Sequence, residues 1–373
     1  MKGFLFIALL LAIASGREFY SLLDPIRDDL NFTVHYYRNL IDHFNPQDER
    51  RYNQRYFINT QHWNNQTGPF FLYICGEGTC GPRASRLFPL ALAEEHRGAL
   101  VLLEHRYYGV SQPFDTWETK NLRYLTVDNA LADIAAFIDF MNNQTESRFG
   151  NNTRQWVVIG GSYPGALSAW FRYKYPHLAV GSIASSAVVR AVADYQAYDW
   201  QVFDSVARSG KKCVDVIHHY NEFVDKAFLN KNRSDAEEIK QIFGVERPIN
   251  DGEFMYFFAD IFAGQVQYGS RRSMCDTLMS FDFNCPWEYL RALANFTRSI
   301  GFTPAGYHME DLQNTTIDFN KASRQWTYQT CTEVGYFQTP FHRRPFRSQL
   351  LKLDYWKQSC REAFGIDIFT HDR

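Results

Sequence analysis

The chain has 373 residues, of which 45% are hydrophobic, 17% aromatic and 21% charged. Lys and Arg total 39 and Asp and Glu total 41, so the formal net charge is −2. A chain of this length can bury a sizeable core, and its aromatic content excludes a disordered protein. The balanced charge argues against a nucleic-acid binder and against a polybasic membrane clamp.

Residues 1–16 have the pattern of a secretory signal peptide. Lys2 precedes the apolar run 4–12, and Ala14-Ser15-Gly16 offers a small-residue cleavage site. The alternative is a buried N-terminal helix. No later segment stays apolar for the ~18 residues that a membrane helix needs, so we expect no membrane span. The sequence therefore predicts a secreted or lysosomal protein that starts near Arg17.

Two further features favour the secretory pathway. Seven cysteines in an oxidising compartment predict disulfides, and the odd number leaves one thiol free, paired with another chain or without its partner. Sequons for N-glycosylation, which permit the modification without requiring it, begin at Asn31, Asn65, Asn143, Asn151, Asn232, Asn295 and Asn314.

Four short apolar runs predict strands that are buried on both faces. They lie at residues 69–75, 99–103, 156–159 and 180–187, and glycines follow the first and third of them. Helical spacing connects them at 131–141, with Thr126 or Asp128 as the N-cap, and at 163–175, where Pro176 ends the helix. Strands that alternate with helices predict a parallel α/β sheet.

From about residue 191 the pattern becomes helical throughout. Apolar residues at helical spacing cover 214–228, and residues 254–262 are aromatic and helical in pattern. Ser234 to Glu237 has the pattern of a capping box, and Gly244 ends that helix. A change from α/β to all-helical texture predicts a domain boundary, with residues 191–330 as a helical insertion.

The strongest local signal for chemistry is the segment from Val157 to Gly165. A buried strand leads into Gly160-Gly161-Ser162, and a helix follows at once, which is the context of a nucleophile elbow. Pro164 occupies the position two after the serine, where the general motif has Gly, and it is tolerable in a first helical turn. The alternative interpretation is a tight strand-to-helix turn without catalytic function.

An elbow of this kind also predicts an oxyanion hole. The Tyr163 N–H stands at a helix N-terminus, where it can stabilise a developing negative charge. The second donor is expected from the loop after an earlier strand, and Gly76-Glu77-Gly78 has this position, with Glu77 or a neighbour as the donor.

Three motifs resemble a known family. They are Gly160 to Gly165 with Ala169 to His177, Glu104 to Gly109, and Gln325 to Glu333. Together they resemble the serine peptidase family of lysosomal Pro-Xaa carboxypeptidase, dipeptidyl peptidase II and thymus-specific serine protease, over about residues 35–365. The resemblance implies an α/β-hydrolase fold with a helical cap inserted after the nucleophile half, and exopeptidase cleavage after proline.

The same resemblance implies domain boundaries and disulfides. Residues 17–190 would form the N-terminal part of the hydrolase domain, 191–330 the cap, and 331–373 the start of the return to the hydrolase domain. It implies a Cys331–Cys360 bridge and a Cys213–Cys275 bridge within the insertion. Cys75 and Cys80 are close enough in sequence for a small loop bridge, which leaves Cys285 as the odd cysteine.

The general acid and base of a hydrolase triad follow the nucleophile in chain order. In the resembled family they lie beyond the segment equivalent to Cys360, and we expect this chain to stop before them, with an incomplete sheet. His371 and Asp372 are neighbours without intervening strands to place them, so they make an improbable pair. His105 belongs to a family motif without a triad role, and we interpret it as structural.

The remaining candidates point away from metals and cofactors. His218 and His219 are adjacent on a helix and face different ways, and no H-E-x-x-H or C-x-x-C spacing is present. We therefore expect no metal and no cofactor.

The sequence thus predicts a serine-type exopeptidase homologue that forms an acyl-enzyme at Ser162 and is inactive as it stands. Tyr336 follows the third motif and is a candidate for substrate specificity. The expected partners are short peptides, without nucleic acid, and a homodimer is left open. The alternatives are a non-catalytic protein that binds peptides or partners, and a fragment from an incomplete gene model.

Overall fold

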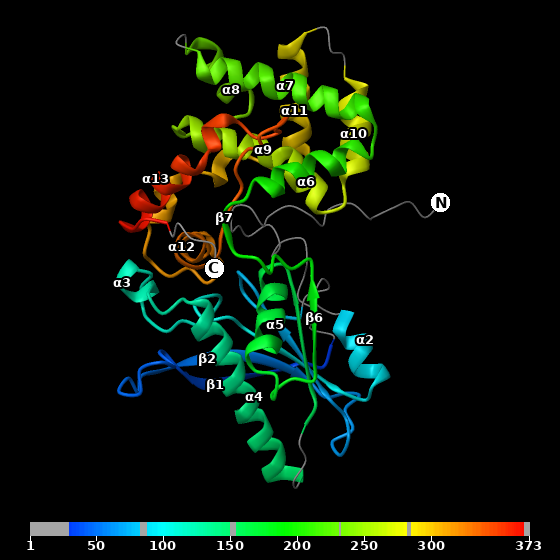
Figure 1. Ribbon diagram of the computed structural model, residues 1–373, viewed down its shortest axis with the longest axis vertical. Helices are drawn as coiled ribbons and strands as arrows, with labels where there is room; N and C mark the ends of the chain where they lie inside the picture. Colours follow the sequence, from blue (N-terminus) through cyan, green and yellow to red (C-terminus); the bar gives the residue numbers. More distant parts are fainter. Residues whose placement is uncertain (1–29, 83–87, 150–153, 231–232, 282–284, 369–373) are drawn as a thin grey trace. The chain divides into compact units, whose positions relative to one another are not determined.

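The structure is a computed structural model that describes residues 30–82, 88–149, 154–230, 233–281 and 285–368. The expected signal peptide and the sequons at Asn151 and Asn232 lie outside these ranges, as do His371 and Asp372. The described chain forms two compact units (Figure 1). The sheet unit comprises residues 30–191 and 314–333, and the helical unit comprises 192–313 and 334–368.

The sheet unit is built on a six-stranded sheet with the order β1-β2-β4-β3-β5-β6. Its strands are β1 (Thr33–Leu40), β2 (Arg51–Asn59), β3 (Phe70–Ile74), β4 (Ala99–Leu103), β5 (Trp156–Gly161) and β6 (Gly181–Ser185). The strands from β3 to β6 pair in parallel, and β1 and β2 are antiparallel to their neighbours. The four apolar runs are therefore confirmed as strands, but the burial expected on both faces holds only for the first three, because β6 is exposed or half-exposed along its length.

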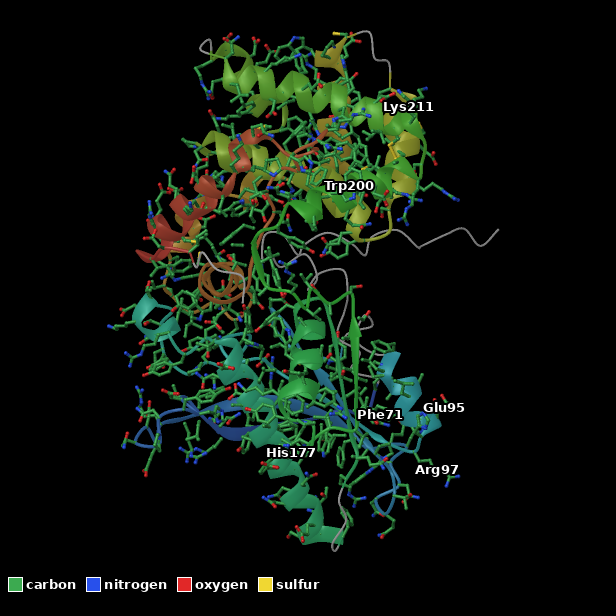
Figure 2. The ribbon with its side chains drawn as sticks, viewed as in Figure 1. Phe71, Glu95, Arg97, His177, Trp200 and Lys211 are labelled. Carbon is green, nitrogen blue, oxygen red and sulfur yellow. A yellow bond between two sulfur atoms is a disulfide. The ribbon has the colours of Figure 1, made fainter. Side chains whose placement is uncertain are left out.

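Helices cover both faces of this sheet. Neighbouring residues of a strand point to opposite faces, so adjacent residues of β2 contact different helices. Phe57 on β2 belongs to a buried cluster with Ala93 of α2 (Phe88–Glu95) and with Phe71, which Figure 2 labels beside this helix. The adjacent Tyr56 points the other way, and its ring lies 4.9 Å from that of Phe137 on α4 (Val127–Phe149). The central strands β3, β4 and β5 are therefore buried between helices, as their apolar runs require.

The antiparallel strands β1 and β2 were not among the predicted strands. Seven of the eight residues of β1 have exposed or half-exposed side chains, and its one fully buried residue is Asn39. On β2, Gln54 and Asn59 are buried beside apolar residues. Buried amides break the apolar alternation by which a strand is recognised. Two of them satisfy each other, because the Asn39 amide donates to Gln54 Oε1 at 2.8 Å.

Two helices position the candidate nucleophile. Helix α4 begins at Val127, and Thr126 Oγ1 accepts the Asn129 N–H at 3.1 Å, so Thr126 is the N-cap rather than Asp128. Helix α5 (Tyr163–Lys174) starts directly after β5 and ends before Tyr175 and Pro176. A parallel sheet with a strand–serine–helix turn in its middle is the architecture of an α/β-hydrolase, here with a partial sheet.

The boundary between the units differs from the expected one in two places. Residues 314–333, with α12 (Ser323–Gln329), belong to the sheet unit, and 334–368 belong to the helical unit. The polar side chains of α12 explain the first difference. Buried Gln325 donates to the Tyr107 carbonyl at 3.1 Å, and buried Arg324 donates to the Trp117 carbonyl at 2.8 Å.

The helical unit packs its helices around one large apolar cluster. Its elements are α6 (Gln196–Ala207), α7 (Lys211–Leu229), α8 (Ser234–Ile242), α9 (Asp251–Gln267), α10 (Arg271–Ser280), α11 (Pro286–Ser299) and α13 (Leu353–Phe364), with the short strands β7 (Val192–Asp194) and β8 (Gly335–Phe337). The strands β7 and β8 pair in parallel. This pairing ties the returning chain to the start of the insertion, which explains the second difference.

One detail of the helical unit contradicts the sequence prediction. Helix α8 begins at Ser234, with Arg233 as the N-cap and no side-chain cap bond, so Ser234 and Glu237 form no capping box. The capping box is at α9 instead, where Asn250 and Glu253 exchange hydrogen bonds of 2.8 and 2.9 Å. Asn is as good an N-cap as Ser, so residues 234–237 and 250–253 both match the capping-box pattern. Only the packing of the helices distinguishes the two segments.

Disulfides join Cys75 to Cys80 in the sheet unit and Cys213 to Cys275 in the helical unit, and these are two of the expected pairs. Cys331 and Cys360 are also disulfide-bonded, whereas Cys285 is free.

We expect the Cys213–Cys275 bridge to stabilise the helical unit more than the Cys75–Cys80 bridge stabilises the sheet unit. The bridges close loops of 62 and 5 residues, and the loop-entropy relation gives about 4 and about 2 kcal/mol for them. Denaturant unfolding of Cys213→Ala/Cys275→Ala and Cys75→Ala/Cys80→Ala double variants measures both losses. Equal losses, or a larger loss in the second variant, would contradict the expectation.

Candidate active site

Ser162 has a backbone conformation that residues with a Cβ rarely adopt. It stands at φ 63° and ψ −128°, between the last residue of β5 and the first of α5. Such a conformation costs about 1–3 kcal/mol and persists only where the surrounding structure imposes it. Two backbone bonds do so, because the Ser162 N–H donates to the Ser185 carbonyl at 2.9 Å and its carbonyl accepts the Ala166 N–H at 3.1 Å. The turn is therefore a strained elbow that presents the serine side chain.

Small residues are required around this elbow because the first turn of α5 crosses the end of β5 very closely. A Cβ on Gly160 would lie 2.1 Å from the Pro164 carbonyl oxygen, and one on Gly165 would lie 2.7 Å from the Ser185 carbonyl oxygen. Gly161, by contrast, faces open space. Two of the three glycines are thus steric requirements of the turn, as the motif predicts.

The loop predicted to supply the second oxyanion donor lies against the elbow. A Cβ on Gly76 would come within 2.7 Å of Pro164 Cγ, so the loop contacts the first turn of α5. The Gly78 N–H donates to the Gly76 carbonyl at 2.8 Å, which closes a tight turn around Glu77. The Cys75–Cys80 disulfide encloses this turn. The elbow and the Glu77 turn are therefore neighbours within the sheet unit.

The second motif, Glu104 to Gly109, forms a buried polar framework behind the loop. Glu104 is fully buried, and its carboxylate accepts from Arg55 at 2.6 Å, from the Cys80 N–H at 2.9 Å and from Ser111 Oγ at 2.7 Å. Gly109 has φ 53°, and a Cβ there would meet Glu104 Oε1 at 2.0 Å. Glycine is therefore required in this motif as well, because a side chain would displace the carboxylate.

Arg106 is the centre of a second buried network in the same motif. Its Nε and Nη2 donate to the two oxygens of Asp133 at 2.6 and 2.7 Å, and its Nη1 donates to the carbonyls of Ile41 and Tyr124. Asp133 also accepts from Tyr52 at 2.8 Å and contacts His43 at 2.8 Å. Arg106 strongly lowers the pKa of Asp133 against the opposing effect of burial, so the carboxyl stays ionised.

Within the described sheet unit, no histidine forms a hydrogen bond with Ser162. His177 is the one histidine after Ser162 in this unit, and it is exposed in the turn beyond α5 (Figure 2). A helix of the 12 residues of α5 is about 18 Å long, which separates His177 from the elbow. His105 contacts a different group, because its Nε2 lies 3.1 Å from the Tyr163 hydroxyl oxygen. The sheet unit thus brings Ser162 together with the loop predicted to supply an oxyanion donor, and the nucleophilic role of Ser162 stays a prediction.

We expect His105 to make folding pH-dependent. Burial lowers its pKa from 6.5 to about 4. Because the folded pKa lies below the unfolded one, stability is lost as the pH falls from 6.5 to about 4, by up to about 3 kcal/mol. Urea unfolding at several pH values should show this loss, and the loss should shrink in His105→Gln. His218, with a pKa of about 4, titrates in both proteins and cancels in the difference. A difference that does not depend on pH would contradict the expectation.

Some predicted site residues belong to the other unit. Tyr336 lies on β8 of the helical unit with φ 59°, and its ring is 6.1 Å from that of Tyr195. Its role in specificity stays a prediction. His218 is also in the helical unit, where its ring packs at 4.9 Å from Phe346. Among the residues that the structure describes, no group of three or more His, Cys, Asp or Glu side chains could hold a metal ion.

Sequence reasoning missed the buried partners of the site. Asp133 was taken only as a residue of a helix, and Gln329 only as part of a motif. The usable signal was that each is polar within a segment otherwise patterned for burial, which requires a polar partner.

The described helices also include none that is long and apolar enough to cross a bilayer.

Comparisons with known proteins agree with the geometry. The protein named "Probable serine protease EDA2" from Arabidopsis thaliana is 32% identical over 386 residues, which cover 98% of this chain and 77% of that protein. Human thymus-specific serine protease is 33% identical, over 90% of this chain and 70% of its own length. Mouse lysosomal Pro-X carboxypeptidase is 32% identical, over 91% and 73%. The profile described as "Serine carboxypeptidase S28" matches residues 39–371. The chain therefore belongs to this family of serine peptidases.

Proposed function

We propose that Ser162 is the nucleophile of a serine-type exopeptidase that acts on short peptides, after proline, through an acyl-enzyme. The observation that carries this proposal is the conformation of Ser162, at φ 63° in a strand-to-helix turn. Strain of this kind is maintained at functional sites and would be selected against in an ordinary turn. The Tyr163 N–H and a donor from the Glu77 turn are the proposed oxyanion hole.

The preference for proline rests on family resemblance. The name of mouse lysosomal Pro-X carboxypeptidase supports it, since that relative covers most of this chain. Tyr336 is the proposed specificity residue, because an aromatic ring is well suited to pack against a prolyl ring. Whether one residue or a dipeptide is released is a separate question that product analysis answers.

We further propose that acylation of this chain is slow. A serine hydroxyl without a general base is a weak nucleophile, and no histidine of the described sheet unit serves Ser162. The proposed oxyanion hole would still stabilise the reaction, so a residual rate is expected, about 10³-fold or more below that of a complete triad.

Labelling with a fluorophosphonate probe tests both parts of this proposal. We expect a slowly forming adduct that peptide mass spectrometry locates on Ser162 and that is lost in Ser162→Ala. Lack of any Ser162 adduct after long incubation would overturn the role of Ser162. Labelling as fast as that of an intact serine peptidase would overturn the proposed slow acylation.

A non-catalytic peptide-binding protein is the second candidate. The observation in its favour is that the Ser162 hydroxyl has no base beside it within the described sheet unit. Isothermal titration with a prolyl tripeptide separates the candidates. Binding at micromolar concentration that persists in Ser162→Ala, together with no Ser162 adduct, would favour the second candidate over the first.

We also propose that the protein enters the secretory pathway. Its disulfides fit an oxidising compartment, and a relative named as lysosomal covers most of the chain. The side chains of all five described sequon asparagines are exposed, namely Asn31, Asn65, Asn143, Asn295 and Asn314. We therefore expect peptide N-glycosidase to increase the gel mobility of protein from eukaryotic cells, whereas unchanged mobility would argue against glycosylation.

A further inference from the structure

The side chain of Tyr163, the residue after the candidate nucleophile, is held by a chain of hydrogen bonds. Its buried hydroxyl lies 3.1 Å from His105 Nε2 and accepts from Gln329 Nε2 at 2.8 Å. Gln329 Oε1 in turn accepts from the Tyr108 hydroxyl at 2.5 Å. The four residues come from the three motifs noted in the sequence. All three motifs therefore meet at Tyr163.

The chemistry of the partners fixes the direction of each bond. His105 Nδ1 lies 2.8 Å from the Arg106 carbonyl oxygen, which can only accept, so Nδ1 carries the proton. Burial keeps the ring neutral by lowering its pKa to about 4, which leaves Nε2 as an acceptor for the Tyr163 hydroxyl. The Tyr163 oxygen then accepts from Gln329, so this hydroxyl both donates and accepts a hydrogen bond.

The same motif holds the other side of the proposed oxyanion hole. Glu104 accepts the Cys80 N–H at 2.9 Å and pairs with Arg55 at 2.6 Å. Arg55 also donates to the Cys80 carbonyl at 3.1 Å. The end of the Glu77 turn is therefore fixed by the residue directly before His105. Adjacent side chains of one segment thus contact the Tyr163 hydroxyl and the Cys80 N–H, which ends the loop that carries Glu77.

We propose that His105 is a positioning residue, which holds Tyr163 through its hydroxyl so that the Tyr163 main-chain N–H points at the developing oxyanion of the Ser162 reaction. This inference rests on the proposed role of Ser162. His105 acts on the reaction only through Tyr163. The elbow fixes the backbone of Tyr163, and His105 and Gln329 fix its side chain. Loosening the side chain would let the first peptide unit of α5 tilt, and oxyanion stabilisation depends steeply on donor geometry.

The groups around His105 determine how its hydrogen bond to Tyr163 responds to acid. Burial lowers the pKa of its ring most, the Arg106 carbonyl and Asp133 raise the pKa, and the Arg106 guanidinium lowers it, whereas the rings of Tyr108 and Tyr163 pack against the imidazole. Burial and, after it, the charge of Glu77 in the Glu77 turn raise the pKa of Tyr108. Protonation turns Nε2 from an acceptor into a donor, so the Tyr163 hydroxyl loses its acceptor. The reaction of Ser162 should therefore slow as the pH approaches 4.

The test compares three variants by the rate at which the fluorophosphonate adduct forms on Ser162. In His105→Leu both hydrogen bonds are lost, and we expect the rate to fall about 10-fold or more. In His105→Gln the side-chain oxygen can still accept from Tyr163, so the rate should stay near that of wild type and lose its decline toward pH 4. His43→Leu is the control, because it removes a contact with buried Asp133 at similar depth without touching Tyr163.

Each outcome separates this inference from the proposed function. Adducts at Ser162 that form equally fast in His105→Leu and wild type would overturn the positioning role and leave the nucleophile intact. An equal loss of rate in His43→Leu would also overturn it, because general destabilisation would then explain the effect. If wild type forms no adduct, the proposed function fails. Amide hydrogen exchange of residues 160–167 then decides the inference: faster exchange in His105→Leu than in His105→Gln supports it, and equal exchange overturns it.

Discussion

Replacing Gly160 by Ala is expected to disrupt the elbow and to lower the free energy of unfolding by about 3 kcal/mol or more. The added Cβ would lie 2.1 Å from the Pro164 carbonyl oxygen, 2.2 Å from its carbonyl carbon and 2.7 Å from the Gly165 nitrogen. All three atoms are backbone, so no side-chain rotation relieves the clash. Helix α5 would have to move away from β5, and Ser162 would lose the turn that holds it. Urea unfolding and the Ser162 labelling rate should both report this change.

Gly161→Ala is the matched control, since it introduces the same methyl group one residue later. No atom lies within 4 Å of the position that its Cβ would occupy. We expect a change in stability of only a few tenths of a kcal/mol and a labelling rate near that of wild type. If both variants behaved alike, the close crossing of α5 over β5 would not be the reason for glycine at position 160.

The second large effect is expected for Arg106→Met. The substitution roughly keeps the volume of the side chain but leaves the Asp133 carboxylate buried without its guanidinium partner, and three backbone carbonyls lose a donor. Breaking a buried ion pair by removing one partner costs about 3–5 kcal/mol. We expect a loss of that size in urea unfolding. Arg106→Lys should also be destabilising, because an ammonium group cannot make the paired contacts of the guanidinium fork.

Arg208→Met provides the surface control for this prediction. Arg208 pairs with Asp204 at 2.9 Å, but the two side chains are 64% and 44% exposed. Solvent screening reduces such pairs to about 0–1 kcal/mol. A loss for Arg208→Met as large as that for Arg106→Met would contradict the view that burial gives the Arg106–Asp133 pair its importance.

The elbow was predictable because its signal is local. Gly160, Ser162 and Gly165 are set by the sterics of one strand-to-helix turn, and steric requirements of this kind can be read from adjacent residues. The parallel strands were equally accessible, since burial on both faces produces continuous apolar runs. The disulfides at Cys75–Cys80 and Cys213–Cys275 were reached by proximity and by resemblance, and both are formed.

What could not be predicted depends on partners distant in sequence. Gln329 and Tyr163 are 166 positions apart, and nothing in either segment indicates which buried polar group the other will meet. The same limit explains the boundary at residues 314–333. A helix with buried Gln325 and Gln329 has no strong apolar stripe, so its polar partners on Tyr107 and Tyr163 decide the unit to which it belongs. The antiparallel strand β2 was missed for a related reason, because its buried amides hide the alternation.

The discontinuous sheet unit also sets an order of events during synthesis. The 122 residues from 192 to 313, both ends included, emerge between Tyr163 and the segment that contacts it. At ribosomal rates of about 5–20 residues per second, this stretch takes roughly 6–25 seconds to appear. During that interval the elbow exists without Gln329, and the Tyr163 hydroxyl lacks its donor. A nascent chain is therefore exposed to chaperones and proteases with its candidate active site unfinished, and the last motif to leave the ribosome completes it.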